Sequence, residues 1–102
     1  FGKDVVIDKE IDYEWARIPH FYSSFYVYKY ATGFSAAIAI SRMIVQEGSP
    51  AVEKYTQFLK SGDSSYPMDI LRKVGVDLTR PQPITEALDF FKDLLDEFEK
   101  LI

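Results

Sequence analysis

The sequence contains no cysteine and only one histidine, His20, among its 102 residues. Without cysteine the chain can form neither a disulfide framework nor a thiolate metal site. One histidine cannot build a zinc site by itself, because such a site takes several histidine, cysteine or carboxylate ligands at matched spacing. The sequence also lacks an HExxH motif and a glycine-rich phosphate loop. We therefore expect no metal site within these residues.

Basic charge and long apolar runs are also scarce. The net charge is −4, and no stripe of lysine and arginine is present to neutralise phosphates, so nucleic acid is not an expected partner. The longest strongly apolar run, residues 36–40, is far too short to cross a bilayer, so no membrane partner is expected. The lack of cysteine fits a reducing compartment, and we expect a cytoplasmic protein.

The size and composition are those of one globular domain. Hydrophobic residues make up 47% and charged residues 27% of the sequence, which is ordinary for a globular protein. The chain begins Phe1-Gly2-Lys3, without an initiator methionine or a signal-peptide pattern. We expect residues 1–102 to form a single segment of a longer protein.

Hydrophobic periodicity predicts an all-α fold with three main helices and two short ones. No window shows the sustained alternation that is typical of a strand. The main helices are expected over residues 19–47, 50–59 and 84–102, and the short ones over residues 9–17 and 67–74.

Proline and the residue before it set the start of the first main helix. Ile18 precedes a proline and is biased away from helical conformation, which predicts a break there. Pro19 suits the first turn of the helix that follows. In the alternative, residues 20–22 stay in a loop and the helix begins after Ser23 or Ser24, which are both good capping residues.

Glycine and proline also set the later boundaries. Gly48 and Gly75 are expected to end helices, because glycine readily adopts the left-handed conformation found just past a helix. Pro81 and Pro83 are expected to keep residues 77–83 extended.

The first main helix is expected to bury one face and to let another helix approach closely. Small residues that permit a close approach are Gly33, Ala36, Ala37 and Ala39. The expected apolar face consists of Phe21, Phe25, Tyr28, Phe34, Ala37, Ile38, Ser41, Ile44 and Val45.

Six of the ten residues from position 21 to position 30 are aromatic, and His20 stands directly before them. One helix turns 100° per residue and cannot point all these rings at one core, so some should face a second surface. A lone histidine is more often structural than functional. Beside several phenols, however, an imidazole supplies donors that can orient a carbonyl or stabilise an oxyanion. On the residues alone, both interpretations stay open.

The run WARIPHFYSSFYVYKYATGFSAA, residues 15–37, resembles the C-terminal signature of the oligoendopeptidase F family, in the thimet-oligopeptidase group of zinc metallopeptidases. The similarity extends over nearly the whole chain, through Gly48-Ser49-Pro50, Tyr55-x-x-Phe58-Leu59-x-Ser61-Gly62, Gly75-Val76-Asp77-Leu78 and residues 81–88.

The resemblance implies an α-helical peptidase, a hydrolase that cleaves short peptides in a deep channel. It also implies zinc in the full-length enzyme, held by an HExxH helix and a downstream glutamate. Because this chain has none of those ligands, the upstream zinc-binding part of the same enzyme is its expected partner. The isolated chain is expected to be metal-free and inactive, and to form a homodimer through its uncovered aromatic run.

The resemblance further implies roles for four residues. His20 matches the motif histidine, and Tyr28 best matches the tyrosine that stabilises the oxyanion, so both are expected to be catalytic. Tyr22 and Tyr26 are candidates for substrate binding. The chain has a serine pair at positions 23 and 24 where the family pattern has Tyr-Asn, which makes these serines poor catalytic candidates. The rival hypothesis is a non-enzymatic α-helical interaction module that binds a partner through its aromatic patch.

Overall fold

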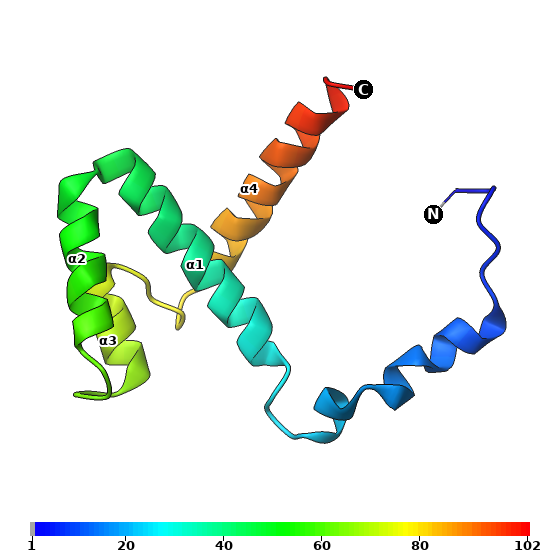
Figure 1. Cartoon of the computed structure of the whole chain (residues 1–102), viewed down its shortest axis with the longest axis horizontal. Helices are drawn as coiled ribbons and strands as arrows, with labels where there is room; N and C mark the ends of the chain where they lie inside the picture. Colours follow the sequence, from blue (N-terminus) through cyan, green and yellow to red (C-terminus); the bar gives the residue numbers. More distant parts are fainter. Residues whose placement is uncertain (1) are drawn as a thin grey trace. The chain divides into compact units, whose positions relative to one another are not determined.

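A computed structural model describes residues 2–102 of the chain, and Figure 1 shows the order of its elements. Within these residues there are helices and no strands, which confirms the predicted all-α fold class. Phe1, part of the chain start considered above, lies outside the described residues. The elements are the 3-10 helices η1 (Lys9–Arg17) and η2 (Pro19–Tyr22) and the α-helices α1 (Tyr28–Glu47), α2 (Ser49–Lys60), α3 (Pro67–Val74) and α4 (Gln82–Glu99).

The chain divides into two compact units, Phe1–Tyr30 and Ala31–Ile102. The expectation of a single domain over residues 1–102 stays a prediction. None of the helices in the described part is long and apolar enough to span a membrane.

The first unit is built from η1 and η2 and contains no buried side chain among its described residues. Ile18 separates the two helices with extended backbone (φ −91°, ψ 108°), which confirms the break predicted before Pro19. The predicted bounds of η1 are also confirmed, although its turns are 3-10. A 3-10 helix has three residues per turn, so Glu14 and Arg17 stack directly and form an ion pair. Hydrogen bonding from Arg17 lowers the pKa of the Glu14 carboxyl.

The predicted start of the first main helix is wrong. Pro19 opens only the short helix η2, and α1 begins at Tyr28. The alternative start after Ser23 or Ser24 comes closer but is also too early. The physical reason is Phe25, whose φ of +56° is left-handed, so a right-handed helix cannot run through it.

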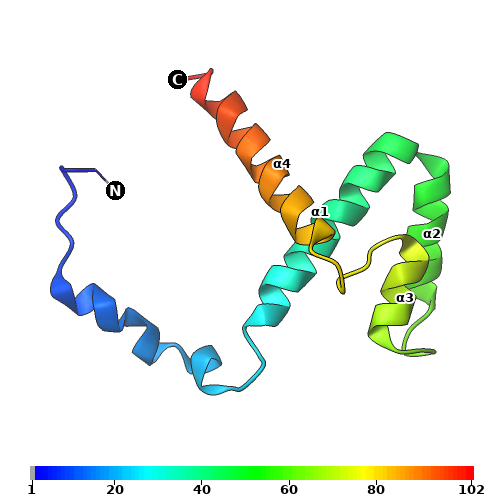
Figure 2. The ribbon, with the colours of Figure 1, turned by 180° about the vertical axis from the view of Figure 1, so that it is seen from behind.

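The core of the second unit lies where α1 meets α3 and the segment that follows α3. Four buried residues form it, and seven partly buried side chains pack against them. Figure 2 shows α2 and α3 side by side, joined by the loop that the sequence predicted at residues 61–65. The buried residues are Ala36, Ile40, Val74 and Val76, and those packed against them are Ala39, Met43, Ile44, Tyr55, Phe58, Leu71 and Leu78.

The face that α1 buries is partly different from the predicted one. Ser35, Ala36 and Ile40 are buried, whereas Phe34 and Val45 are 70% and 84% exposed. Ala37 and Ser41 are exposed as well. Apolar residues surround this helix on several sides, so periodicity alone did not select the buried one. The prediction that another helix approaches closely at Gly33 is also wrong, because a Cβ built there meets no atom within 4 Å.

Glycines end α1 and α3, as predicted. Gly48 has φ +68° and Gly75 has φ +110°. At Gly75 the backbone N–H donates to the Arg72 carbonyl at 3.0 Å, and the Val76 N–H donates to the Leu71 carbonyl at 3.1 Å. This pair of bonds is the Schellman motif, which satisfies carbonyls left unpaired at the helix end.

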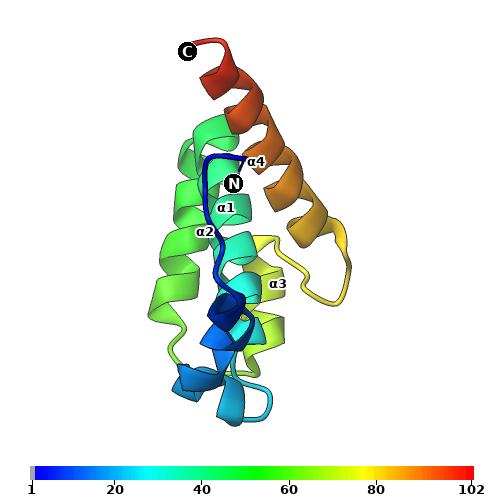
Figure 3. The ribbon, with the colours of Figure 1, turned by 90° about the vertical axis from the view of Figure 1, so that its right-hand side faces the viewer.

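The helix α4 begins two residues earlier than predicted and ends three residues earlier, at Glu99. Pro83 therefore lies in its first turn, where a missing N–H costs nothing. The extended segment predicted over residues 77–83 is wrong, because the Arg80 N–H donates to the Asp77 carbonyl at 3.2 Å in a turn and Pro81 has helical backbone angles (φ −69°, ψ −20°). Only Pro83 and Ala87 are buried in this helix. Figure 1 shows α4 leading away from α1, and Figure 3 shows it rising from the loop that follows α3. Much of its apolar face is exposed, at Leu88, Phe91, Leu94, Leu95 and Phe98.

Candidate functional site

Three rings from the aromatic region gather in the first unit, and we call them the His20–Tyr26–Tyr30 cluster. The ring centroids lie 5.4 Å apart for His20 and Tyr26, 6.0 Å for His20 and Tyr30, and 5.8 Å for the two tyrosines. Both contacts of Tyr30 are edge-to-face, with interplanar angles of 69° and 72°. These are favourable arrangements for aromatic rings.

The local backbone explains how residues ten apart in sequence come together. His20 lies on η2, and the left-handed turn at Phe25 redirects the chain between His20 and Tyr26. Tyr26 comes just before α1, and its carbonyl accepts the Lys29 N–H at 3.2 Å. Side chains four apart lie on the same side of a helical turn, which places Tyr30 beside Tyr26.

The two tyrosines of the cluster are joined through their hydroxyls. The Tyr30 hydroxyl donates to the Tyr26 hydroxyl at 3.3 Å. That hydrogen bond, with some loss of solvation, raises the pKa of Tyr30. The Lys29 ammonium lies 5.2 Å from the centre of the Tyr26 ring, within cation–π range. Tyr26 is 37% exposed and Tyr30 is 58% exposed, so a ligand can reach both.

The other two predicted site residues lie outside this cluster. Tyr28 is the first residue of α1 and is 56% exposed. A helix turns about 200° over two residues, so Tyr28 projects to a different side from Tyr26 and Tyr30. The Tyr22 hydroxyl donates to the Ala16 carbonyl at 2.6 Å. Of the four predicted site residues, the structure thus brings together the rings of His20 and Tyr26.

Tyr30 is the cluster residue that the sequence did not single out. The four-residue spacing from Tyr26 was the available signal, because it pairs side chains on one turn of a helix. The helix predicted over residues 19–47 contains both tyrosines, so this signal was present in the sequence.

The described residues contain no group of three or more histidine, cysteine, aspartate or glutamate side chains that could hold a metal ion. The donor set of this chain therefore does not fit the zinc that the resemblance implies for the longer enzyme.

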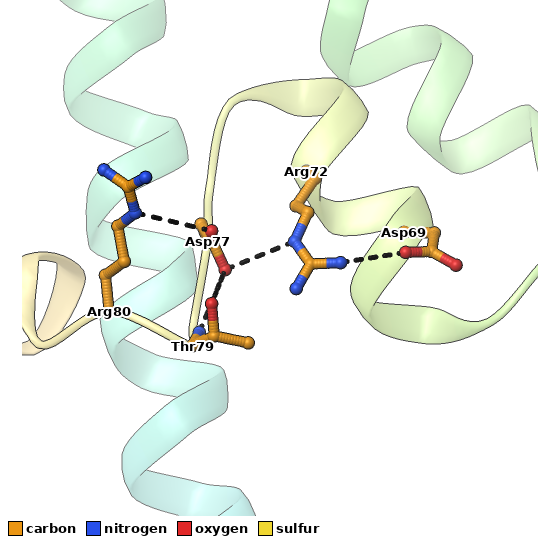
Figure 4. A network of polar contacts seen from close by, with 5 residues as sticks. All are labelled: Asp69, Arg72, Asp77, Thr79 and Arg80. Atoms are coloured by element: carbon orange, nitrogen blue, oxygen red, sulfur yellow. Dashed lines mark hydrogen bonds and ion pairs between the residues drawn. The ribbon is translucent and has the colours of Figure 1, made fainter.

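A second polar region lies in the other unit, between α3 and α4 (Figure 4). The Asp77 carboxylate accepts bonds from the Thr79 hydroxyl at 2.6 Å and the Thr79 N–H at 3.0 Å. Arg72 Nε donates to Asp77 at 3.3 Å, and Arg72 Nη1 donates to Asp69 at 2.9 Å. Arg80 Nε lies 3.7 Å from Asp77.

This network borders an open pocket of about 320 Å³ whose lining includes Asp77, Arg80, Gln82 and Glu86. Gln82 also donates to Glu86 at 2.6 Å. The charged groups here pair with one another and tie the end of α3 to the segment that follows it, residues 77–80. Such pairing is that of a structural network, so the aromatic cluster is the stronger candidate site.

Comparison with known proteins identifies the family. Residues 1–90 match the model of peptidase family M3. The chain belongs to this family. Among M3 relatives, it is 58% identical over 102 residues to oligopeptidase PepF of Bacillus subtilis. It is 45% identical over 93 residues, 91% of the chain, to the plasmid-encoded oligoendopeptidase F of Lactococcus lactis subsp. cremoris.

A solved structure gives the same assignment. The crystal structure of oligoendopeptidase-F from Enterococcus faecium superimposes with a TM-score of 0.85 at 45% identity, over 98% of this chain and 19% of that one. The resemblance to the oligoendopeptidase F family is therefore confirmed. The rival hypothesis of a stand-alone interaction module gains no support from these matches.

The chain spans only a small part of these M3 peptidases, 15% of the Bacillus subtilis protein and 16% of the Lactococcus lactis protein. It corresponds to a segment of a larger peptidase. The comparisons do not support the expected position of that segment at the C-terminal end, and we do not retain it.

Proposed function

We propose that this chain is the segment of an M3 oligoendopeptidase that supplies substrate-binding and oxyanion-stabilising side chains for the hydrolysis of short peptides. The observation that carries the proposal is the His20–Tyr26–Tyr30 cluster, an accessible group of one imidazole and two phenols. It combines the single histidine of the sequence with two tyrosine rings that contact it.

Peptide hydrolysis needs hydrogen-bond donors such as an imidazole N–H or a phenol O–H. Attack on the scissile carbonyl places negative charge on its oxygen, and donors held ready for that oxygen stabilise the transition state. We assign this role to the His20 imidazole N–H and the Tyr28 hydroxyl. A substrate carbonyl would be held between these two groups.

Tyr22 and Tyr26 are proposed to contact the substrate in different ways. The Tyr22 hydroxyl already donates its proton to Ala16, so it offers a ring surface and an acceptor. The Tyr26 oxygen accepts from Tyr30 and keeps its own proton, which it can donate to a peptide carbonyl.

The remaining elements of the proposal concern the longer enzyme. Its zinc would be held by another part of the polypeptide, and the present chain would neither hold that metal nor cleave peptides alone. A cytoplasmic location belongs to the same proposal.

The test uses the full enzyme that contains this segment, with Tyr28→Phe and His20→Ala as separate variants. Loss of one oxyanion donor lowers kcat by roughly 10²–10³-fold. KM should stay nearly constant, because the interaction forms in the transition state. Tyr66→Phe is the matched control, since that side chain is 80% exposed and belongs to the other unit. An unchanged kcat in both test variants would refute the assignment.

A further inference from the structure

Tyr26 and Tyr30 differ in how firmly the backbone holds them. Tyr30 is in the first turn of α1, and its N–H donates to the Val27 carbonyl at 3.2 Å. Tyr26 precedes the helix and follows Phe25, whose left-handed conformation is rare for an aromatic residue. The side chain of Tyr26 therefore takes its direction from neighbouring rings more than from its own backbone.

Tyr30 touches both of the other members of the cluster. Its ring meets the His20 ring edge-on and the Tyr26 ring edge-on. Its hydroxyl also donates a hydrogen bond to the Tyr26 hydroxyl at 3.3 Å. That bond is longer than the roughly 2.7–2.8 Å usual between hydroxyls. Hydrogen bonds in sites without substrate are often long and tighten when the substrate arrives.

The direction of this bond decides what Tyr26 can do. A phenol can donate one proton and accept others. When Tyr30 donates to the Tyr26 oxygen, that oxygen is occupied as an acceptor and the Tyr26 proton is directed elsewhere. Two hydroxyls in series also polarise one another, which makes the terminal O–H a better donor. A raised pKa at Tyr30 agrees with Tyr30 keeping its proton in this bond.

We propose that Tyr30 is a positioning residue, which turns the Tyr26 hydroxyl so that its proton is presented to a backbone carbonyl of the bound peptide. This inference rests on the proposed function, and it adds a residue that acts only through Tyr26. Tyr30 itself touches no substrate atom in this scheme.

The experiment is a double-mutant cycle in the full enzyme, with Tyr26→Phe, Tyr30→Phe and the double variant. Both substitutions keep the rings and remove only the hydroxyls. Tyr30→Phe should raise KM about fivefold, the size of one net hydrogen bond, with kcat within about twofold. In the Tyr26→Phe background the same change should have no further effect on KM, because the group through which Tyr30 acts is already gone.

Two controls separate this inference from its alternatives. Tyr13→Phe removes a hydroxyl from the same unit, at a side chain 72% exposed, and should leave KM and kcat unchanged. His20→Ala reports on the proposed function independently. The positioning role is wrong if Tyr30→Phe leaves KM unchanged, or if its effect on KM simply multiplies that of Tyr26→Phe in the double variant. In either case the proposed function still stands when His20→Ala lowers kcat. If His20→Ala and Tyr28→Phe both leave kcat unchanged, the proposed function itself fails.

Discussion

Replacing Gly75 with alanine should destabilise the second unit by about 1–2 kcal/mol. Gly75 ends α3 with φ +110°, a conformation that costs an L-residue roughly 1–2 kcal/mol. The new Cβ would also lie 3.3 Å from the Met43 sulfur, which is tight, but a thioether is flexible enough to shift. Strain in the backbone is therefore the dominant effect, with the steric contact adding to it.

Gly33→Ala is the matched control, and it should change the folding stability in the opposite direction. Gly33 lies inside α1, and a Cβ there meets no atom within 4 Å. Alanine at an exposed helical position is favoured over glycine by about 0.5–1 kcal/mol. Both positions belong to the unit Ala31–Ile102, so one unfolding transition reports on both.

Urea and thermal unfolding, followed by far-ultraviolet circular dichroism, measure these changes. For a domain of this size about 1 kcal/mol shifts the melting temperature by roughly 4–8 °C. Gly75→Ala should melt below the parent chain and Gly33→Ala above it. If Gly75→Ala were as stable as the parent, the account of the α3 terminus as a glycine-dependent Schellman motif would be refuted.

Three more outcomes are expected of the chain by itself. After dialysis it should retain less than one equivalent of zinc, which elemental analysis measures, and one equivalent held per chain would contradict this. Light scattering at micromolar concentration should show a dimer formed through residues 21–30, because large uncovered apolar patches are rarely left bare; a monomer that binds no hydrophobic dye would overturn this. Bonds from Thr79 and the neighbouring Arg72 lower the pKa of Asp77 below its ordinary value of 3.8. Its stabilising effect should therefore be complete above about pH 5 and lost as pH falls below about 4. Denaturation midpoints of the parent and Asp77→Asn should converge there, and a gap that persists at low pH would show that the charge is not involved.

The helix boundaries set by glycine or proline were the most predictable part of the fold. Gly48 and Gly75 end helices because their conformation is one that other residues avoid, and the break at Ile18 follows from the proline after it. The start of α1 was not predictable in this way. It depends on Phe25 adopting a left-handed conformation, for which an aromatic side chain gives no signal.

The candidate site was predictable in composition but not in arrangement. The concentration of aromatic residues behind His20 marked the region, and the family resemblance assigned roles within it. The contact of His20 with Tyr26 forms across a turn, and that of Tyr26 with Tyr30 forms at the start of α1. The four-residue spacing of the two tyrosines suits a helix with either start, but the His20–Tyr26 contact cannot be derived from spacing because it depends on the turn at Phe25.

The single tryptophan gives the two units separate optical signals. Trp15 lies in the unit Phe1–Tyr30 and is 55% exposed, while the four α-helices belong mainly to Ala31–Ile102. Tryptophan emission therefore reports on the aromatic site region, and circular dichroism reports mostly on the helical core. Because the described part of the first unit buries no side chain, emission should resemble that of a solvated indole in the chain alone. A shift to shorter wavelength on adding the rest of the peptidase would then register the covering of this region directly.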